Sequence, residues 1–153
     1  MGRKSDGSLD GLLYENAMDL VASVIPKPTV SQLAHILRVA LPRLWQVGLT
    51  GVHDFDRRDC FAALQILHAA GELNLRVLKS IPLEDLPQAV GLGLRNGFGD
   101  DMLRIGSVKA FMDGALGPQT AAMLEPYEGT LTELGILMLD GEEIFEHARL
   151  AAE

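Results

Sequence analysis

The spacing of apolar residues predicts helices and strands that alternate along the chain. Apolar residues recur at helical intervals within 11–24, 29–47, 58–70, 83–94 and 140–153. Shorter apolar runs at 49–55, 74–81 and 103–111 have the length of buried strands. Successive strands begin about 25 residues apart, which is typical of repeated β/α units and a parallel sheet. The pattern therefore predicts an α/β fold with about three parallel strands and flanking helices.

Turn and capping residues fix several of these boundaries. Pro26 and Pro28 stop the first helix. Thr29 and Gln32 have the spacing of a capping box at the start of the second. Three strands are too few for a closed α/β barrel, which needs eight strands and roughly 250 residues. The chain is therefore either a small open α/β domain or a piece of a larger one, and a final helical pattern that runs to the last residue favours the piece.

Composition narrows the classes of partner and compartment. The net charge is −8, from 13 basic and 21 acidic residues, which argues against nucleic acid because phosphate binding needs a basic face. No apolar run approaches the roughly 18 residues of a membrane span. Cys60 is the only cysteine, so no internal disulfide can form and a cytoplasmic location is expected. Within its helical pattern, Cys60 is expected to be a small core residue rather than a reactive thiol.

The stretch 105–118 carries the strongest chemical signal. It reads as a buried strand that ends in a glycine-rich loop, with Lys109 late in the strand and Asp113 at its exit. Catalytic groups of α/β barrel enzymes lie at this end of the strands. The region 112–134 that follows is rich in Gly, Pro and Thr, and long loops of this kind are usually functional. On spacing alone, a lysine in this position is most often a strand-end lysine that reaches solvent.

Several blocks, in order along the chain, resemble the amidohydrolase superfamily and within it the YtcJ/AepA-like metal-dependent hydrolases. The most specific block is Val-Lys-x-Phe-x-Asp-Gly-x-Leu-Gly at 108–117. The weaker blocks are Leu12–Ala17, Gly48–Asp54, Leu75–Val77, Thr120–Ala122 and Glu125–Tyr127. The resemblance implies a partial (β/α)₈ barrel of the TIM type. On that reading residues 1–10 are a flexible lead-in, and 11–153 are a barrel fragment truncated at both ends.

The resemblance also implies a metal centre. The family binds one or two divalent metals, zinc among them, at the carboxyl ends of its strands. Lys109 matches the lysine that is carboxylated in two-metal members and bridges the metals. The implied reaction is hydrolysis of an amide or cyclic amide by a metal-activated water. The implied substrate is a small molecule.

The chain departs from the family pattern in its histidines. It has no His-x-His, and its four histidines, His35, His53, His68 and His147, do not form the family's ligand set. Lys109 is thus the one metal ligand expected here. We expect the isolated chain to bind no metal and to be inactive.

Four further residues are candidates for substrate contacts: His53, Asp54, Asp113 and Gly114. His53 and Asp54 end the first predicted strand, and either could face a site or serve a structural role. Asp113-Gly114 is also a common turn pair whose carboxylate can accept hydrogen bonds from loop amides.

Two classes of function remain open. One is a segment of a metal-dependent hydrolase of C–N bonds. The other is a non-catalytic α/β domain that binds a ligand or a partner on the same scaffold. An incomplete barrel exposes two sheet edges, so self-association through those edges is expected.

Overall fold

The computed structural model describes residues 2–13 and 15–153. The backbone divides into two compact units. One unit, here called the sheet unit, comprises residues 28–110 and 141–153. The other, here called the loop unit, comprises residues 1–27 and 111–140.

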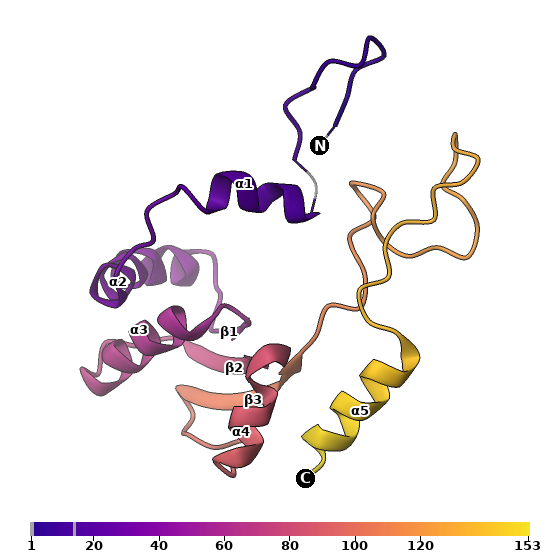
Figure 1. Ribbon diagram of the computed structural model, residues 1–153. Coiled ribbons are helices and arrows are strands. Elements are labelled where there is room, and N and C mark those ends of the chain that lie inside the picture. Colours follow the sequence, from indigo (N-terminus) through magenta and orange to yellow (C-terminus); the bar gives the residue numbers. More distant parts are fainter. Residues whose placement is uncertain (1, 14) are drawn as a thin grey trace. The chain divides into compact units, whose positions relative to one another are not determined.

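Three parallel strands form the centre of the sheet unit, in the order β1-β2-β3 (Figure 1). They are β1 (Gly51–Asp54), β2 (Arg76–Pro82) and β3 (Leu103–Lys109). All three predicted strands and their parallel pairing are confirmed. β3 ends at Lys109, two residues before the predicted end, because its last paired residue on β2 is Pro82, where β2 stops.

Two long helices follow the predicted boundaries closely. α2 (Val30–Gln46) begins with the predicted capping box. The backbone N–H of Gln32 donates to Thr29 Oγ1 at 3.3 Å, and the backbone N–H of Thr29 donates to Gln32 Oε1 at 2.8 Å. α3 (Arg58–Ala69) is followed by Gly71, whose φ of 68° suits glycine at a helix end.

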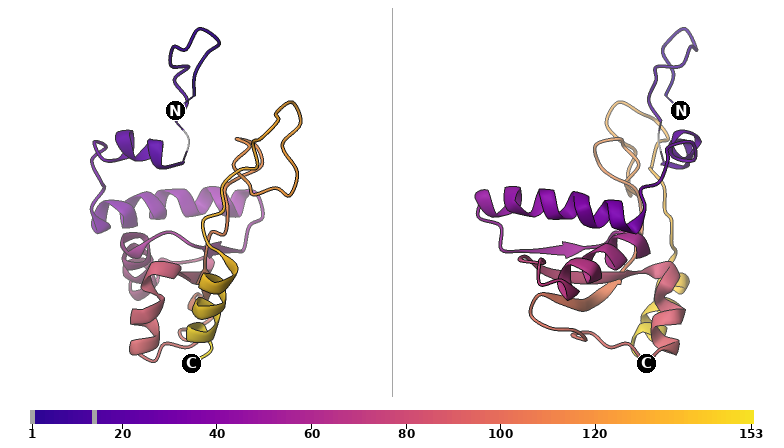
Figure 2. Two further views of the ribbon diagram at one scale, coloured as in Figure 1. Left: turned by 45° about the vertical axis from the view of Figure 1, so that its right-hand side comes forward. Right: turned by 90° about the vertical axis from the view of Figure 1, so that its left-hand side faces the viewer.

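The core lies between these two helices and one face of the sheet. α2 and α3 run side by side there (Figures 1 and 2). The buried residues are apolar and come from both helices, from β2 and β3, and from the turn before β2: Ala34, Leu41, Ala63, Leu64, Leu67, Leu73, Leu75, Val77 and Leu103. Val77 therefore marks the helix-facing side of the sheet. Successive strand residues point to opposite faces, so its neighbours at 76 and 78 point away from the helices.

The third predicted helix, 83–94, is wrong in extent. A 3₁₀ turn, η2 (Leu83–Asp85), leads into a short α4 (Leu86–Gly91). Pro87 is tolerated because it lies in the first turn, and Gly93, with φ of 68°, follows the helix end. α5 (Gly141–Ala151), predicted at 140–153, packs against α4 (Figure 2).

The loop unit has little regular structure. The helix predicted over 11–24 is replaced by a 3₁₀ turn, η1 (Glu15–Met18), and a single turn, α1 (Asp19–Ala22), while Tyr14 of the prediction lies outside the described residues. Leu20, Val21 and Val24 are exposed, so no packing stabilises a longer helix. Along the described parts of the chain, none of the helices has the length and apolarity to cross a membrane.

Candidate active site

The carboxyl ends of the three strands bring charged side chains to one edge of the sheet. Asp54 is the last residue of β1 and pairs in register with Lys79 of β2. Lys109 is the last residue of β3 and pairs with Pro82. Lys109 thus lies late in its strand, as predicted, and in α/β barrel enzymes catalytic groups lie at this end of the strands.

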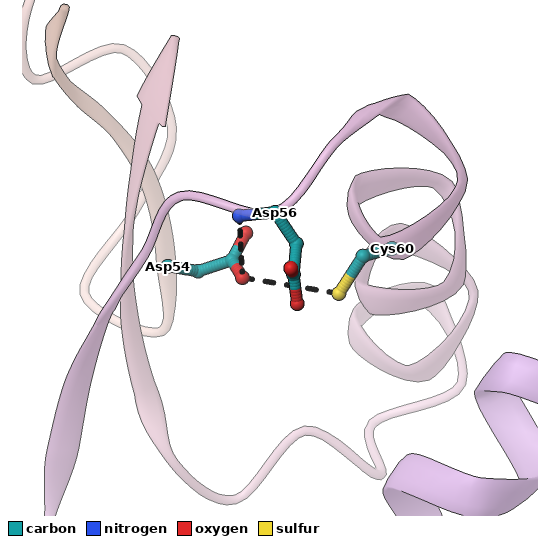
Figure 3. Close-up of side chains that lie close together, drawn as sticks. All are labelled: Asp54, Asp56 and Cys60. Atoms are coloured by element: carbon teal, nitrogen blue, oxygen red, sulfur yellow. Dashed lines mark hydrogen bonds between the residues drawn. The ribbon is translucent and has the colours of Figure 1, made fainter. Parts of the chain in front are cut away.

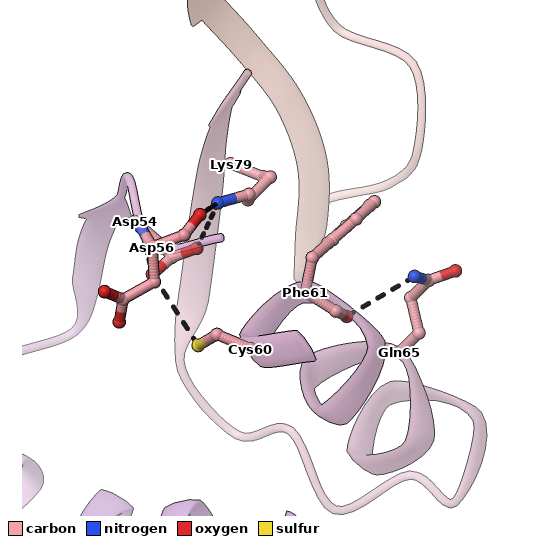
Figure 4. A network of polar contacts seen from close by, with 6 residues as sticks. All are labelled: Asp54, Asp56, Cys60, Phe61, Gln65 and Lys79. Atoms are coloured by element: carbon pink, nitrogen blue, oxygen red, sulfur yellow. Dashed lines mark hydrogen bonds and ion pairs between the residues drawn. The ribbon is translucent and has the colours of Figure 1, made fainter. Parts of the chain in front are cut away.

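Lys79 is the most buried charged residue of this edge. Its side chain is 2% exposed, and its Nζ lies 2.8 Å from Asp54 Oδ2, a carboxylate that is 13% exposed. The same ammonium donates to the backbone carbonyl of Asp56 (Figure 4). Lys79 alternates with Val77 along β2, so it points to the helix-facing side. A buried charge is tolerated only when it is paired, and here one cation joins the end of β1 to β2.

Cys60 belongs to this cluster. It lies in the first turn of α3, with its Sγ 3.8 Å from Asp54 Oδ1. Burial is the largest of the causes that raise the pKa of the Cys60 thiol to about 12, and the nearby carboxylates of Asp54 and Asp56 act in the same direction. The thiol packs partly buried against the core, in agreement with the small-residue reading. A thiol held in its protonated form is a poor nucleophile and a poor metal ligand.

Asp54, Asp56 and Cys60 could by distance hold a cation. One ligand atom from each lies within 4.8 Å of the others (Figure 3). However, the Lys79 ammonium already neutralises Asp54, and the thiol is protonated. These three residues therefore do not suit a divalent metal. Along the described chain no other group of three or more such side chains comes this close.

Lys109 lies on the opposite side of the sheet from this cluster. Its neighbour Val108 pairs with Ile81, which alternates with Lys79 on the helix-facing side, so Lys109 points away from the helices. Its Nζ is 5.6 Å from the centre of the Phe55 ring. A cation at this distance from a ring face is attracted by the ring's quadrupole. Phe55 follows the end of β1, so the contact links the two outer strands across β2.

His53 and Asp54 do not form one site. They are adjacent on β1, and their register partners are Leu78 and Lys79, which point to opposite faces. His53 is exposed on the same side as Lys109, whereas Asp54 points toward the helices and pairs with Lys79. Asp54 thus has a structural partner in Lys79.

Asp113 and Gly114 belong to the loop unit and are held by local contacts. Asp113 Oδ2 accepts a hydrogen bond from the backbone N–H of Ala122 at 2.9 Å. Thr120 Oγ1 accepts one from the N–H of Ala115 at 2.9 Å, and a Cβ at Gly114 would overlap the Thr120 side chain. The loop amide contact predicted for Asp113 is therefore present, and Gly114 is needed for close approach.

A cavity of about 470 Å³ lies beside Lys79 on the helix-facing side, lined mostly by apolar side chains of α3, α4 and the end of β2. Lys79 alternates with Ile81 along its wall. Lys109 does not line it, so this cavity is distinct from the opposite side of the sheet, on which Lys109 and His53 lie.

A second polar contact in the sheet unit accounts for His68. His68 Nε2 lies 2.7 Å from Asp100 Oδ2. Backbone N–H groups of Leu103 and Met102 lower the pKa of the Asp100 carboxyl, and His68 lowers it further. Asp100 thus caps the turn that leads into β3, and His68 has a structural partner.

Sequence reasoning missed Lys79, Asp56 and Phe55. A signal for Lys79 was present: Leu75, Val77, Lys79 and Ile81 form an alternating stripe in which one member is charged. A lysine in a buried stripe needs a nearby anion. The aspartate at the end of the preceding strand was the available partner.

Comparison with known sequences identifies the family of this chain. The sequence profile of the Amidohydrolase family matches residues 1–153. The chain is 27% identical to "Putative amidohydrolase YtcJ" of Bacillus subtilis (strain 168), with 99% of the chain and 29% of that protein covered. It is 26% identical to "Protein LONG AFTER FAR-RED 3" of Arabidopsis thaliana, with 93% and 26% covered. The chain therefore spans less than a third of these relatives.

Two solved structures described as uncharacterized metal-dependent hydrolases have a similar fold. A metal-dependent hydrolase from Pyrococcus horikoshii OT3 superposes with a TM-score of 0.80 at 26% identity, covering 98% of the chain and 31% of that structure. One from Pyrococcus furiosus has a TM-score of 0.77 at 27% identity, covering 99% and 33%. The predicted partial TIM-type barrel is thus confirmed. With a family match over its whole length, this chain belongs to the amidohydrolase family.

Proposed function

We propose that the chain is a segment of a metal-dependent hydrolase barrel that cleaves C–N bonds of small amides or cyclic amides. The supporting observation is Lys109 at the carboxyl end of a parallel strand, inside the most specific block of the family resemblance. The two similar solved structures are metal-dependent hydrolases, which supports a divalent metal in the complete barrel.

In this proposal Lys109 is the residue of this chain that binds metal. Addition of CO₂ to its neutral amine gives a carbamate, whose two oxygens suit two cations. A divalent metal such as zinc supplies an activated water when bound. His53, on the same side of the sheet, is the better placed of the two β1 candidates for a substrate contact. Asp113 and Gly114 would shape the loop that follows the strand.

The isolated chain is proposed to be inactive. Lys109 is one ligand, and in the group of Asp54, Asp56 and Cys60 on the other side of the sheet Asp54 is already paired with Lys79. The remaining ligands would come from parts of the barrel that this chain does not include. A cytoplasmic location of the complete enzyme is proposed from the single cysteine.

A chimera tests the proposal. Residues 1–153 would replace the matching segment of the Bacillus subtilis relative, and metal content and hydrolysis of a panel of amides and cyclic amides would be measured. We expect bound metal and turnover, both lost in Lys109→Arg and kept in Lys27→Arg. Metal and turnover that survive Lys109→Arg would contradict the role of Lys109. A folded chimera that binds amides without metal or turnover would favour the non-catalytic alternative.

Self-association is proposed through the sheet edges. Among the described residues β1 pairs only with β2, which leaves its other edge open, whereas residues 97–100 form hydrogen bonds along part of the outer edge of β3. Unpaired edges are templates for pairing with another chain. Light scattering after size-exclusion chromatography should show dimers or larger species, and a monomer at high concentration would refute this proposal.

A further inference from the structure

Three consecutive residues connect the end of β1 toward α3: Asp54, Phe55 and Asp56. Lys79 contacts the first through its carboxylate and the third through its backbone carbonyl (Figure 4). The backbone N–H of Asp56 also donates to Asp54 Oδ1 at 3.4 Å. Both outer residues of this triplet are thus held on the helix-facing side of the sheet by one ammonium.

Because Asp54 and Asp56 are held by Lys79, the position of Phe55 between them is constrained. Phe55 lies between these two residues in the sequence, directly after β1, and the Lys109 side chain that it meets points away from the helices. Its ring lies on that side against Lys109, with the ammonium 5.6 Å from the ring centre. The position of Phe55 therefore depends on contacts made on the other face of the sheet.

We propose that Lys79 is a positioning residue: by holding Asp54 and Asp56 it places the Phe55 ring against Lys109. The relevance of Lys79 to hydrolysis rests on the proposed function, whereas the contact between Phe55 and Lys109 does not depend on it. A ring face attracts a cation, so the contact favours a Lys109 side chain that lies on this side of the sheet. Phe55 is thus one contact that positions the Lys109 side chain.

The charges around the triplet explain why Lys79 is needed. Ligand atoms of Asp54 and Asp56 lie within 4.8 Å of each other, so their like charges repel. Lys79 is almost fully buried and supplies the compensating charge from within the sheet. Without it, the carboxylates would turn toward water and the triplet would lose the geometry that aims Phe55.

NMR of the metal-free chain tests this directly. The sequence has four lysines, Lys4, Lys27, Lys79 and Lys109, so reductive ¹³C-methylation gives few signals. Methylated lysine keeps its positive charge, and Lys109→Arg identifies the Lys109 signal. We expect ring current from Phe55 to shift the Lys109 methyl signal upfield. The shift should vanish in Phe55→Leu.

The decisive variant is Lys79→Met, with Lys27→Met as the control. Lys79→Met should remove most of the Lys109 shift and Lys27→Met none of it. Asp54→Asn keeps Lys79 but weakens its contact with residue 54, so this variant should lose part of the Lys109 shift. It replaces Lys79→Met in the test if Lys79→Met does not fold. Folded Lys79→Met or Asp54→Asn protein with a wild-type Lys109 signal would overturn the proposal, as would an unchanged signal in Phe55→Leu. Neither readout needs metal or turnover, so the result is independent of the proposed function.

Discussion

Replacing Lys79 with methionine should destabilise the sheet unit strongly. The substitution keeps most of the aliphatic volume and removes the ammonium. Asp54 and the carbonyl of Asp56 then lose their shared donor. Removing one partner of a buried ion pair costs about 3–5 kcal/mol. Asp54 is 13% exposed, so water can reach it in part, and the lower end, about 3 kcal/mol, is expected.

Urea unfolding followed by tryptophan fluorescence measures this loss. Trp45 is the only tryptophan and lies in α2, within the same unit as Lys79. With a slope of about 2 kcal/mol per molar urea, a loss of about 3 kcal/mol moves the midpoint down by about 1.5 M. Lys27→Met, at an exposed lysine, should change stability by less than about 0.5 kcal/mol.

A double variant separates two contributions to this loss: the lost attraction between Lys79 and Asp54, and the cost of leaving the Asp54 carboxylate buried without a partner. Lys79→Met combined with Asp54→Leu removes both charges, and apolar replacement of a buried pair is often nearly neutral. The double variant should therefore be more stable than Lys79→Met alone, with a coupling energy of at least about 1 kcal/mol. Two results would refute the argument that this pair is buried and coupled: an unfolding free energy of Lys79→Met within about 0.5 kcal/mol of wild type, or strict additivity of the two substitutions in this double-mutant cycle.

Three further outcomes follow from single residues. Because the pKa of Cys60 is raised from 9.0 to about 12, iodoacetamide at pH 8 should alkylate the folded chain about 1000-fold more slowly than the urea-unfolded chain; a difference below about tenfold contradicts the buried thiol. Thr29→Ala removes the capping box and should cost about 1 kcal/mol by urea unfolding, against little change for Ser31→Ala in the same turn. Gly106→Ala places a Cβ 2.7 Å from a leucine side chain and should cost about 1–3 kcal/mol, whereas Gly91→Ala, with nothing within 4 Å, should not; equal stabilities would argue against the tight β2–β3 packing.

Local chemistry made much of the sheet unit predictable from sequence. The Thr29 capping box and the glycines after α2 and α3 fix helix ends through contacts within a few residues. The strands were predictable because their apolar runs are short and regularly spaced. α4 was overestimated because apolar spacing continues past Gly91, while the backbone at Gly93 has already left the helix.

The candidate site was less predictable because its contacts are long-range. Lys109 was found through a motif that covers its own strand. The Lys79–Asp54 pair joins residues 25 positions apart, and the Phe55–Lys109 contact joins the two outer strands. Neither partner can be chosen from sequence until the strand register is known. The division of His53 and Asp54 between two faces also follows from register alone.

The Lys79–Asp54 pair also bears on how this sheet selects one alignment of its strands. A slip of one residue between β1 and β2 would turn every side chain of the slipped strand to the other face. Lys79 would then lose its carboxylate partner and lie unpaired against apolar side chains. The free-energy cost of such an unpaired buried charge is far above the cost of turning one valine to the wrong face of the sheet. Four-residue β1 offers few side chains to distinguish one alignment from another. A single buried charge pair can therefore specify the register of a strand too short to specify it by apolar packing.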